Sequence, residues 1–122
     1  MSAALAFLHA YGARVLLAYA VVLGVWGTYQ YFRRAQVSPG FRSSYLIMAV
    51  VTPLQGLVGG VLFILGQRPT ELLHIVYGIF AVLFLPGAFL YAQGGTKRRE
   101  AVILAGACWI VAIAYFRGIA TG

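Results

Sequence analysis

Four long apolar stretches, separated by short polar segments, dominate the sequence. They cover about residues 12–32, 44–65, 71–92 and 101–116. A bilayer core of about 30 Å is crossed by about 20 apolar residues in an α-helix, and the four stretches are close to that length. They are continuously apolar instead of alternating, which argues against the strands of a transmembrane barrel. The sequence therefore predicts four transmembrane helices in a single domain, residues 1–122.

The segments between the stretches have turn sequences. Residues 38–40 are Ser-Pro-Gly, residues 66–70 are Gly-Gln-Arg-Pro-Thr, and residues 94–96 are Gly-Gly-Thr. We expect Thr70 to cap the N-terminus of the third helix. Because links this short join antiparallel neighbours, the expected fold is all-α, a transmembrane four-helix up-down-up-down bundle.

Composition identifies lipid as the solvent of these helices. Of the 122 residues, 62% are hydrophobic and 9% are charged, and the mean hydropathy is +0.90. A soluble domain is typically about 45–50% apolar and about 25% charged. The chain thus has too few polar residues to cover a water-soluble globule.

The net charge of +7 lies mainly in two links. Lys and Arg are retained on the cytoplasmic side of a membrane, so clusters between apolar stretches indicate topology and argue against nucleic-acid binding. We therefore expect a multi-pass protein of the bacterial cytoplasmic membrane with both termini extracytoplasmic. Six of the nine basic residues form these clusters: Arg33, Arg34, Arg42, Lys97, Arg98 and Arg99.

Two parts of the chain resemble each other. His9 and His74 each follow an apolar residue and a Leu, and each precedes a Tyr-Gly pair by a few residues. The distances from His9 to Arg33 and from His74 to Arg98 are both 24 residues. This pattern predicts two tandem helical hairpins in the same orientation. Coincidence within a low-complexity apolar sequence is the alternative.

Most catalytic chemistry is missing from the sequence. There is no Asp, and both carboxylates, Glu71 and Glu100, lie at the ends of apolar stretches. Intramembrane proton relays use acids near the midplane, so proton-coupled transport is disfavoured. The lone Cys108 cannot form an internal disulfide, and we expect it to be a small buried residue. We therefore expect a protein that is not an enzyme.

The two histidines carry the remaining chemistry. Helices one and three enter the bundle from the same side, so His9 and His74 should lie at the same, extracytoplasmic end. With neighbouring helices about 8–10 Å apart, the axes of these diagonal helices would be about 11–14 Å apart. Two imidazoles reaching across that gap can take both axial positions of one haem iron. The predicted metal ligands are His9 and His74 and the predicted cofactor is haem b, with solvated interfacial histidines as the alternative.

Further residues fit a haem site at the same depth. Gly59 and Gly60 would let a flat macrocycle approach the second helix, although glycine pairs also form helix-packing seams. Arg14 and Arg117 are candidates to pair with haem propionates or to extend towards lipid headgroups. Tyr77 shares a helical face with His74.

Gln55 is the only strongly polar side chain near mid-membrane. We expect it to make a hydrogen bond inside the bundle. It would then hold two helices together or, alternatively, contact a quinone or another ligand.

Three motifs carry a resemblance to known proteins: His9-Ala-Tyr-Gly-Ala-Arg, the segment 53–60 (Pro-Leu-Gln-Gly-Leu-Val-Gly-Gly), and His74. Together they resemble small bacterial four-helix membrane proteins of uncharacterised function. The chain is also loosely similar to cytochrome b561-type proteins, which have four helices and paired histidines. That family uses two haems near opposite faces, whereas this chain has ligands for at most one.

Three functions follow as hypotheses. The first is a bis-histidine b-type haem protein that exchanges electrons with a quinone or an extracytoplasmic partner, or that handles haem. The second is a non-enzymatic accessory or scaffold subunit of a larger membrane complex. The third is a small channel or exporter formed by a homodimer, which the scarcity of buried polar residues disfavours.

Overall fold

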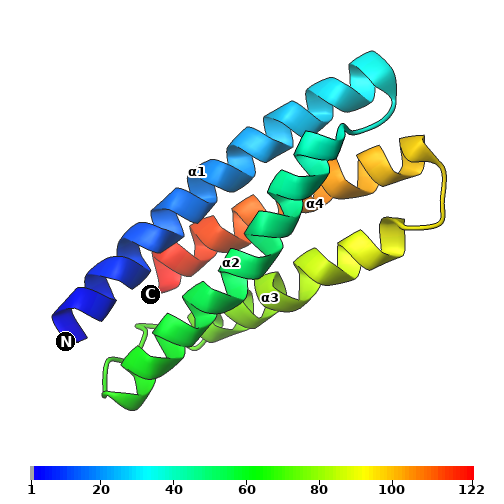
Figure 1. Ribbon diagram of the computed structural model, residues 1–122. Coiled ribbons are helices and arrows are strands. Elements are labelled where there is room, and N and C mark those ends of the chain that lie inside the picture. The colour runs from blue at the N-terminus through cyan, green and yellow to red at the C-terminus, as the bar shows by residue number, and fades with distance from the viewer. Residues whose placement is uncertain (1) are drawn as a thin grey trace.

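The computed structural model describes residues 2–122, which form four α-helices (Figure 1). These are α1 (Ser2–Arg34), α2 (Pro39–Ile64), α3 (Leu73–Ala92) and α4 (Lys97–Thr121). Residues 2–122 contain no strand. Successive helices run in opposite directions, so the start of α1, the end of α4 and the α2–α3 link lie at the same end (Figure 1). The predicted all-α four-helix bundle is confirmed.

The two ends of the bundle differ in chemistry. We call the end that carries the α2–α3 link the histidine end, because His9 and His74 lie towards it. We call the opposite end, which carries the α1–α2 and α3–α4 links, the basic end. Helices α2 and α4 each pack against both α1 and α3, so α1 and α3 face each other across the bundle. This arrangement allows side chains from α1 and α3 to meet.

Two helices extend well beyond the apolar stretches of the sequence. Helix α1 begins at Ser2, ten residues before the predicted span, and α4 covers residues 97–121 instead of 101–116. At the start of α4 the Thr96 hydroxyl accepts a hydrogen bond from the Arg99 amide at 3.1 Å, which is an ordinary N-cap. The extension of α1 places His9 two turns inside a helix.

Thr70 does not cap α3. Its hydroxyl donates to the Gly122 carbonyl at 2.8 Å, while Leu72 occupies the N-cap position without a side-chain hydrogen bond. The predicted Thr70 cap is therefore wrong. The amides of Thr70 and Glu71 donate to the carbonyls of Gly122 and Thr121, so the link is held against the end of α4.

Helix α4 is the most buried of the four helices. Glycines on α1 allow α4 to pack closely against it: a Cβ atom on Gly24 would lie 2.8 Å from the Trp109 ring, and one on Gly27 would lie 3.0 Å from the Ala105 Cβ. Small residues at helix interfaces let membrane helices pack closely without a hydrophobic driving force. The small buried side chains of α4 are Ala101, Ala105, Ala107, Cys108, Ala112 and Ala114.

Polar groups in the middle of the bundle are paired. The Tyr45 hydroxyl of α2 donates to the Leu85 carbonyl of α3 at 2.7 Å. The Thr52 hydroxyl donates to the Met48 carbonyl at 2.8 Å and accepts from the Tyr115 hydroxyl. Such pairing is what a hydrocarbon environment demands, because no water is present there to replace a missing partner.

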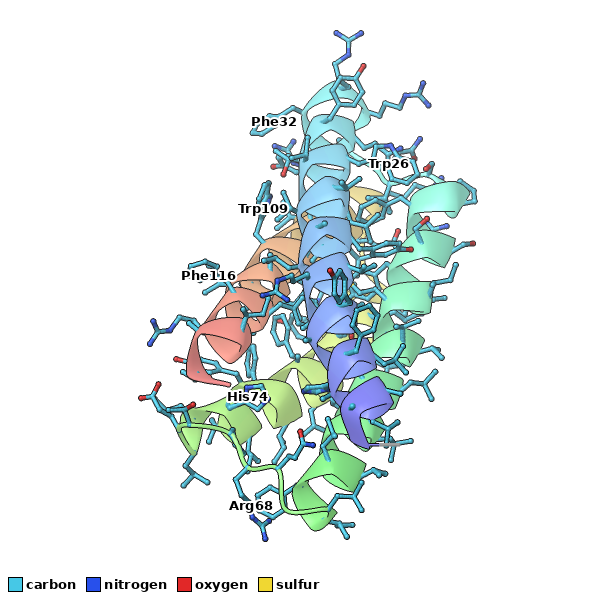
Figure 2. All side chains as sticks on the ribbon, turned by 90° about the vertical axis from the view of Figure 1, so that its left-hand side faces the viewer. Trp26, Phe32, Arg68, His74, Trp109 and Phe116 are labelled. Atoms are coloured by element: carbon cyan, nitrogen blue, oxygen red, sulfur yellow. The ribbon has the colours of Figure 1, made fainter. Side chains whose placement is uncertain are left out.

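The outer surface of the bundle is largely apolar (Figure 2). Large side chains such as Phe32, Ile64, Leu83 and Phe116 are more than half exposed. All four helices are long and apolar enough to cross a membrane. An apolar surface of this extent fits contact with lipid chains.

The α1–α4 seam can be tested at Gly27. In Gly27→Ala the new methyl group would lie 2.9 Å from the Phe41 ring and 3.0 Å from the Ala105 Cβ. We expect a loss of about 1–3 kcal/mol in the free energy of unfolding, measured by circular dichroism in detergent. Gly78→Ala is the matched control, since nothing lies within 4 Å of its Cβ position, and it should be neutral or stabilising by up to about 1 kcal/mol. Equal stability of the two variants would contradict this packing.

Candidate functional site

The two histidines of the chain meet at the histidine end. His9 comes from the third turn of α1 and His74 from the first turn of α3. Their ring centroids are 5.9 Å apart and the ring planes are inclined by 65°. Figure 2 shows His74 between α3 and the end of α4. Residues separated by 65 positions in the sequence thus form one contact pair.

His74 is held by the end of α4. Its Nδ1 lies 2.7 Å from the Gly118 carbonyl oxygen. A carbonyl oxygen can only accept, so Nδ1 donates to it and Nε2 takes no part in this bond. The ring also lies against Gly122, where a Cβ atom would be 2.8 Å from Cε1 and Nδ1. The Gly118 carbonyl therefore fixes both the tautomer and the orientation of His74.

His9 is packed against α2. A Cβ atom on Gly59 would lie 2.8 Å from Cε1 of His9, so only glycine leaves room for the imidazole there. Nδ1 of His9 is buried and has no hydrogen-bond partner within residues 2–122. A buried nitrogen without a partner costs free energy. A ligand that engages this nitrogen would remove that cost.

Gln55 ties α2 to the same turn of α1. Its Nε2 donates to the His9 carbonyl at 2.6 Å. Its Oε1 lies so close to Gly12 that a Cβ atom there would be only 2.6 Å away. The hydrogen bond expected of Gln55 inside the bundle is confirmed. The bond joins α1 and α2 beside the histidine pair.

The other residues predicted for the site lie at different distances from it. Gly60 has nothing within 4 Å of its Cβ position, so it does not contact the histidine pair as Gly59 does. Arg14 is exposed and, five residues after His9, lies on a different face of α1. Arg117 lies over the ring of Tyr77 at 5.9 Å from its centroid, one residue before Gly118. Arg117 and Tyr77 thus flank the His74 side of the site.

Sequence reasoning missed the role of the end of α4. Gly118 and Gly122 position His74, and Gly122 also accepts from Thr70. Hydropathy gives no indication of these contacts, because they are made by backbone carbonyls and depend on the absence of a side chain at glycine. The pattern Gly-x-x-x-Gly at residues 118–122, typical of close helix approach, is the one available indication.

The chemistry open to this arrangement is metal coordination by two imidazoles. Within residues 2–122, no group of three or more His, Cys, Asp or Glu side chains gathers. A three- or four-ligand site of the zinc type is therefore not formed by the described side chains. Two histidines are the ligand number that a metal already held by a macrocycle requires.

Comparison with known proteins supplies no family: no family model, curated protein or solved structure matches the chain. The resemblance to small bacterial four-helix proteins and to cytochrome b561-type proteins accordingly stays a prediction. Function has to be argued from the geometry of the histidine pair.

The histidine contact can be tested without any cofactor. In protein labelled only at histidine, we expect a nuclear Overhauser contact between the two imidazole rings. Gly59→Ala should abolish it, because the methyl group would occupy the space beside Cε1 of His9. Gly60→Ala, one residue further on, should preserve it. Absence of the contact in the unsubstituted protein would contradict the geometry.

Proposed function

We propose that the chain is a b-type haem-binding membrane protein in which His9 and His74 are the two axial ligands. The observation that carries the proposal is the separation of 5.9 Å between the two ring centroids. Two metal–nitrogen bonds of about 2 Å, plus the distance from each nitrogen to its ring centre, place such rings about 6 Å apart on opposite sides of one metal.

The hydrogen bonding of both rings supports the proposal. In metal-binding histidines the second ring nitrogen commonly donates to a backbone carbonyl, which fixes the ring and raises its basicity. His74 has this arrangement through the Gly118 carbonyl at 2.7 Å. His9 offers Nδ1, a buried nitrogen with no partner within residues 2–122. Each ring thus has a nitrogen available for iron.

Space for a macrocycle has to come from the first turns of α1. The two imidazoles line neither a cavity of about 250 Å³ at the basic end nor a groove of about 450 Å³ between α3 and α4. Ala3, Ala4, Phe7 and Leu8 are exposed, whereas Gln55 holds the His9 turn to α2, so a movement that makes room would have to be confined to the turns before His9.

A bound haem would supply one-electron redox chemistry through its iron. His9 and His74 would hold it between α1 and α3, and Arg117, beside Tyr77, would be placed to pair with a propionate. The pair lies towards one end of the bundle, which we propose is extracytoplasmic. Electron exchange with a quinone or an extracytoplasmic partner, or the handling of haem, is the activity that such a one-sided site serves.

A visible absorption spectrum tests the proposal. Protein purified from haem-replete cells should show Soret and α bands with about one haem per chain. His74→Ala and His9→Ala should each lose these bands, because one axial ligand is removed. Leu73→Ala, at the exposed neighbour of His74, is the matched control and should keep them. A colourless protein, or bands that survive in both histidine variants, would refute the proposal.

A second candidate function, a subunit of a larger membrane complex, is favoured by a groove on the outer surface. The groove lies between α3 and α4, has a volume of about 450 Å³ and is almost wholly apolar. Gly87, Ala88, Gly106 and Ala107 line it. Small residues of this kind allow the helix of another subunit to approach closely. The two functions are compatible if the chain is a haem subunit.

Co-purification tests the second candidate. Gly106→Leu would place a large side chain in the groove and should release a stoichiometric partner from the complex. Gly78→Leu adds the same side chain on α3 outside the groove, at another position with nothing within 4 Å, and should leave the complex intact. Purification of the unsubstituted chain without any stoichiometric partner would exclude this function.

A further inference from the structure

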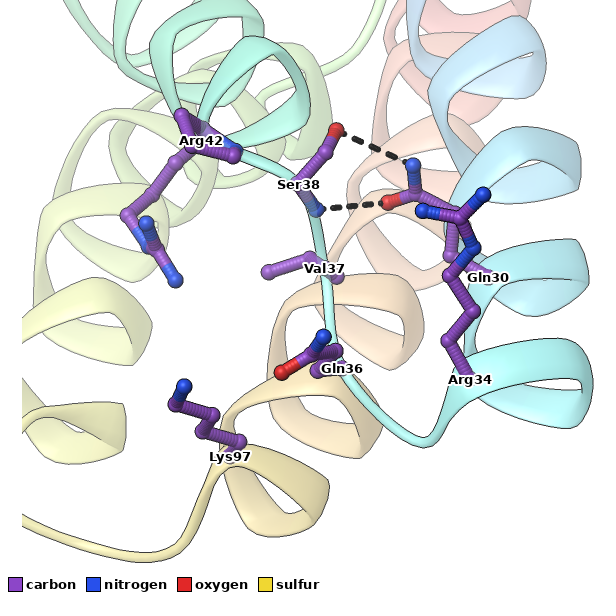
Figure 3. Close-up of a pocket in the computed structure, with 8 residues that line it drawn as sticks. Gln30, Arg34, Gln36, Val37, Ser38, Arg42 and Lys97 are labelled. Atoms are coloured by element: carbon purple, nitrogen blue, oxygen red, sulfur yellow. Dashed lines mark hydrogen bonds between the residues drawn. The ribbon is translucent and has the colours of Figure 1, made fainter.

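A cavity of about 250 Å³ opens at the basic end. Three basic residues from three helices line it: Arg34 of α1, Arg42 of α2 and Lys97 of α4. Figure 3 shows Arg42 and Lys97 on one side of the α1–α2 link, with Gln30 and Arg34 on the other. The cavity is thus bordered by cations from segments that are far apart in the sequence.

The wall of the cavity is fixed by a pair of hydrogen bonds. Gln30 donates from Nε2 to the Ser38 hydroxyl at 3.0 Å, and its Oε1 accepts from the Ser38 amide at 3.0 Å (Figure 3). The Ser38 hydroxyl also caps α2 by accepting from the Phe41 amide. The link is therefore held in one conformation, which lowers the entropy cost of binding a ligand there.

Only one of the three cations is neutralised. Arg42 forms a bidentate pair with Glu100, with nitrogen–oxygen distances of 2.9 and 2.8 Å. This is the only ion pair among residues 2–122, so Arg34 and Lys97 face the cavity without a carboxylate partner. Two cations that make no ion pair beside a preformed cavity favour an anion.

Two of the three remaining cations of the basic end contact aromatic side chains. Arg98 donates to the Tyr31 hydroxyl at 3.3 Å, and Arg99 lies over the Tyr91 ring at 4.4 Å from its centroid. Neither lines the cavity. Membrane topology requires only an excess of positive charge at this end. It does not require that Arg34, Arg42 and Lys97 line one cavity.

The depth of the cavity identifies the class of anion. Tyr29, Phe32 and Tyr91 are exposed near the same end, and exposed aromatic residues gather at the level of the lipid headgroups. Basic pockets between membrane helices bind phosphate-bearing headgroups. We infer that this cavity binds the phosphate group of an anionic ligand, which at this depth is a phospholipid headgroup. The inference is independent of haem binding at the opposite end.

Lipid retention tests the inference. The full chain is reconstituted in nanodiscs of phosphatidylcholine with increasing phosphatidylglycerol, and retained lipids are counted by native mass spectrometry. We expect at least one tightly retained phosphatidylglycerol. The double variant Arg34→Gln/Lys97→Gln should bind it about tenfold more weakly, because two charge-assisted contacts are lost. Both side chains are exposed, so thermal unfolding in phosphatidylcholine should be unchanged.

The matched control is Arg33→Gln/Arg98→Gln, which makes the same charge change one position away on the same two helices. It should retain phosphatidylglycerol as the unsubstituted chain does. Equally weakened phosphatidylglycerol binding in both double variants would mean diffuse attraction and would overturn the site. The site would also be overturned if the chain showed no preference for phosphatidylglycerol over phosphatidylcholine and did not bind inorganic phosphate.

Titration with inorganic phosphate separates the two sources of the phosphate group. Binding of inorganic phosphate that is lost only in Arg34→Gln/Lys97→Gln, without retained phosphatidylglycerol, would support the site and assign it to a soluble phosphate. Retained phosphatidylglycerol that inorganic phosphate cannot displace would support the site and assign it to the lipid.

Discussion

Close packing of α1 and α3 on opposite sides of α4 is the constraint on which the rest of the structure depends. Alanine, cysteine and glycine along this seam let the helices approach closely, and in lipid such contacts replace the hydrophobic effect as the source of stability. Because α1 and α3 pack against the same helix, the turns that carry His9 and His74 lie close together. The contact of 5.9 Å between His9 and His74 follows from this packing.

The same packing separates two kinds of chemistry along the bundle. At the histidine end, the two imidazoles lie against glycines and the carbonyl of Gly118, an environment suited to a metal held between two helices. At the basic end, Arg34 and Lys97 border a cavity. Between the two ends the polar groups are paired and the outer surface is apolar, so the middle of the bundle suits a hydrocarbon environment.

Much of this could be predicted from the sequence, because apolar length and short links leave little choice of fold. The shared end of His9 and His74 follows from topology alone. The distance between the two rings does not follow from topology, since it depends on how closely α1 and α3 pack against α4. The capping role expected of Thr70 failed because the end of α4, distant in sequence, offers its carbonyls instead. Hydropathy also underestimated the lengths of α1 and α4, because it detects apolar residues and does not detect where a helix ends.

Ligation of one iron by imidazoles from opposite helices can be measured by electron paramagnetic resonance of the oxidised, purified protein, because the signal depends on both axial ligands at once. We expect a low-spin ferric signal characteristic of two imidazole ligands, which becomes high-spin or disappears when either histidine is replaced. A high-spin signal from the unsubstituted protein, or the absence of any haem signal from protein made in haem-replete cells, would contradict it.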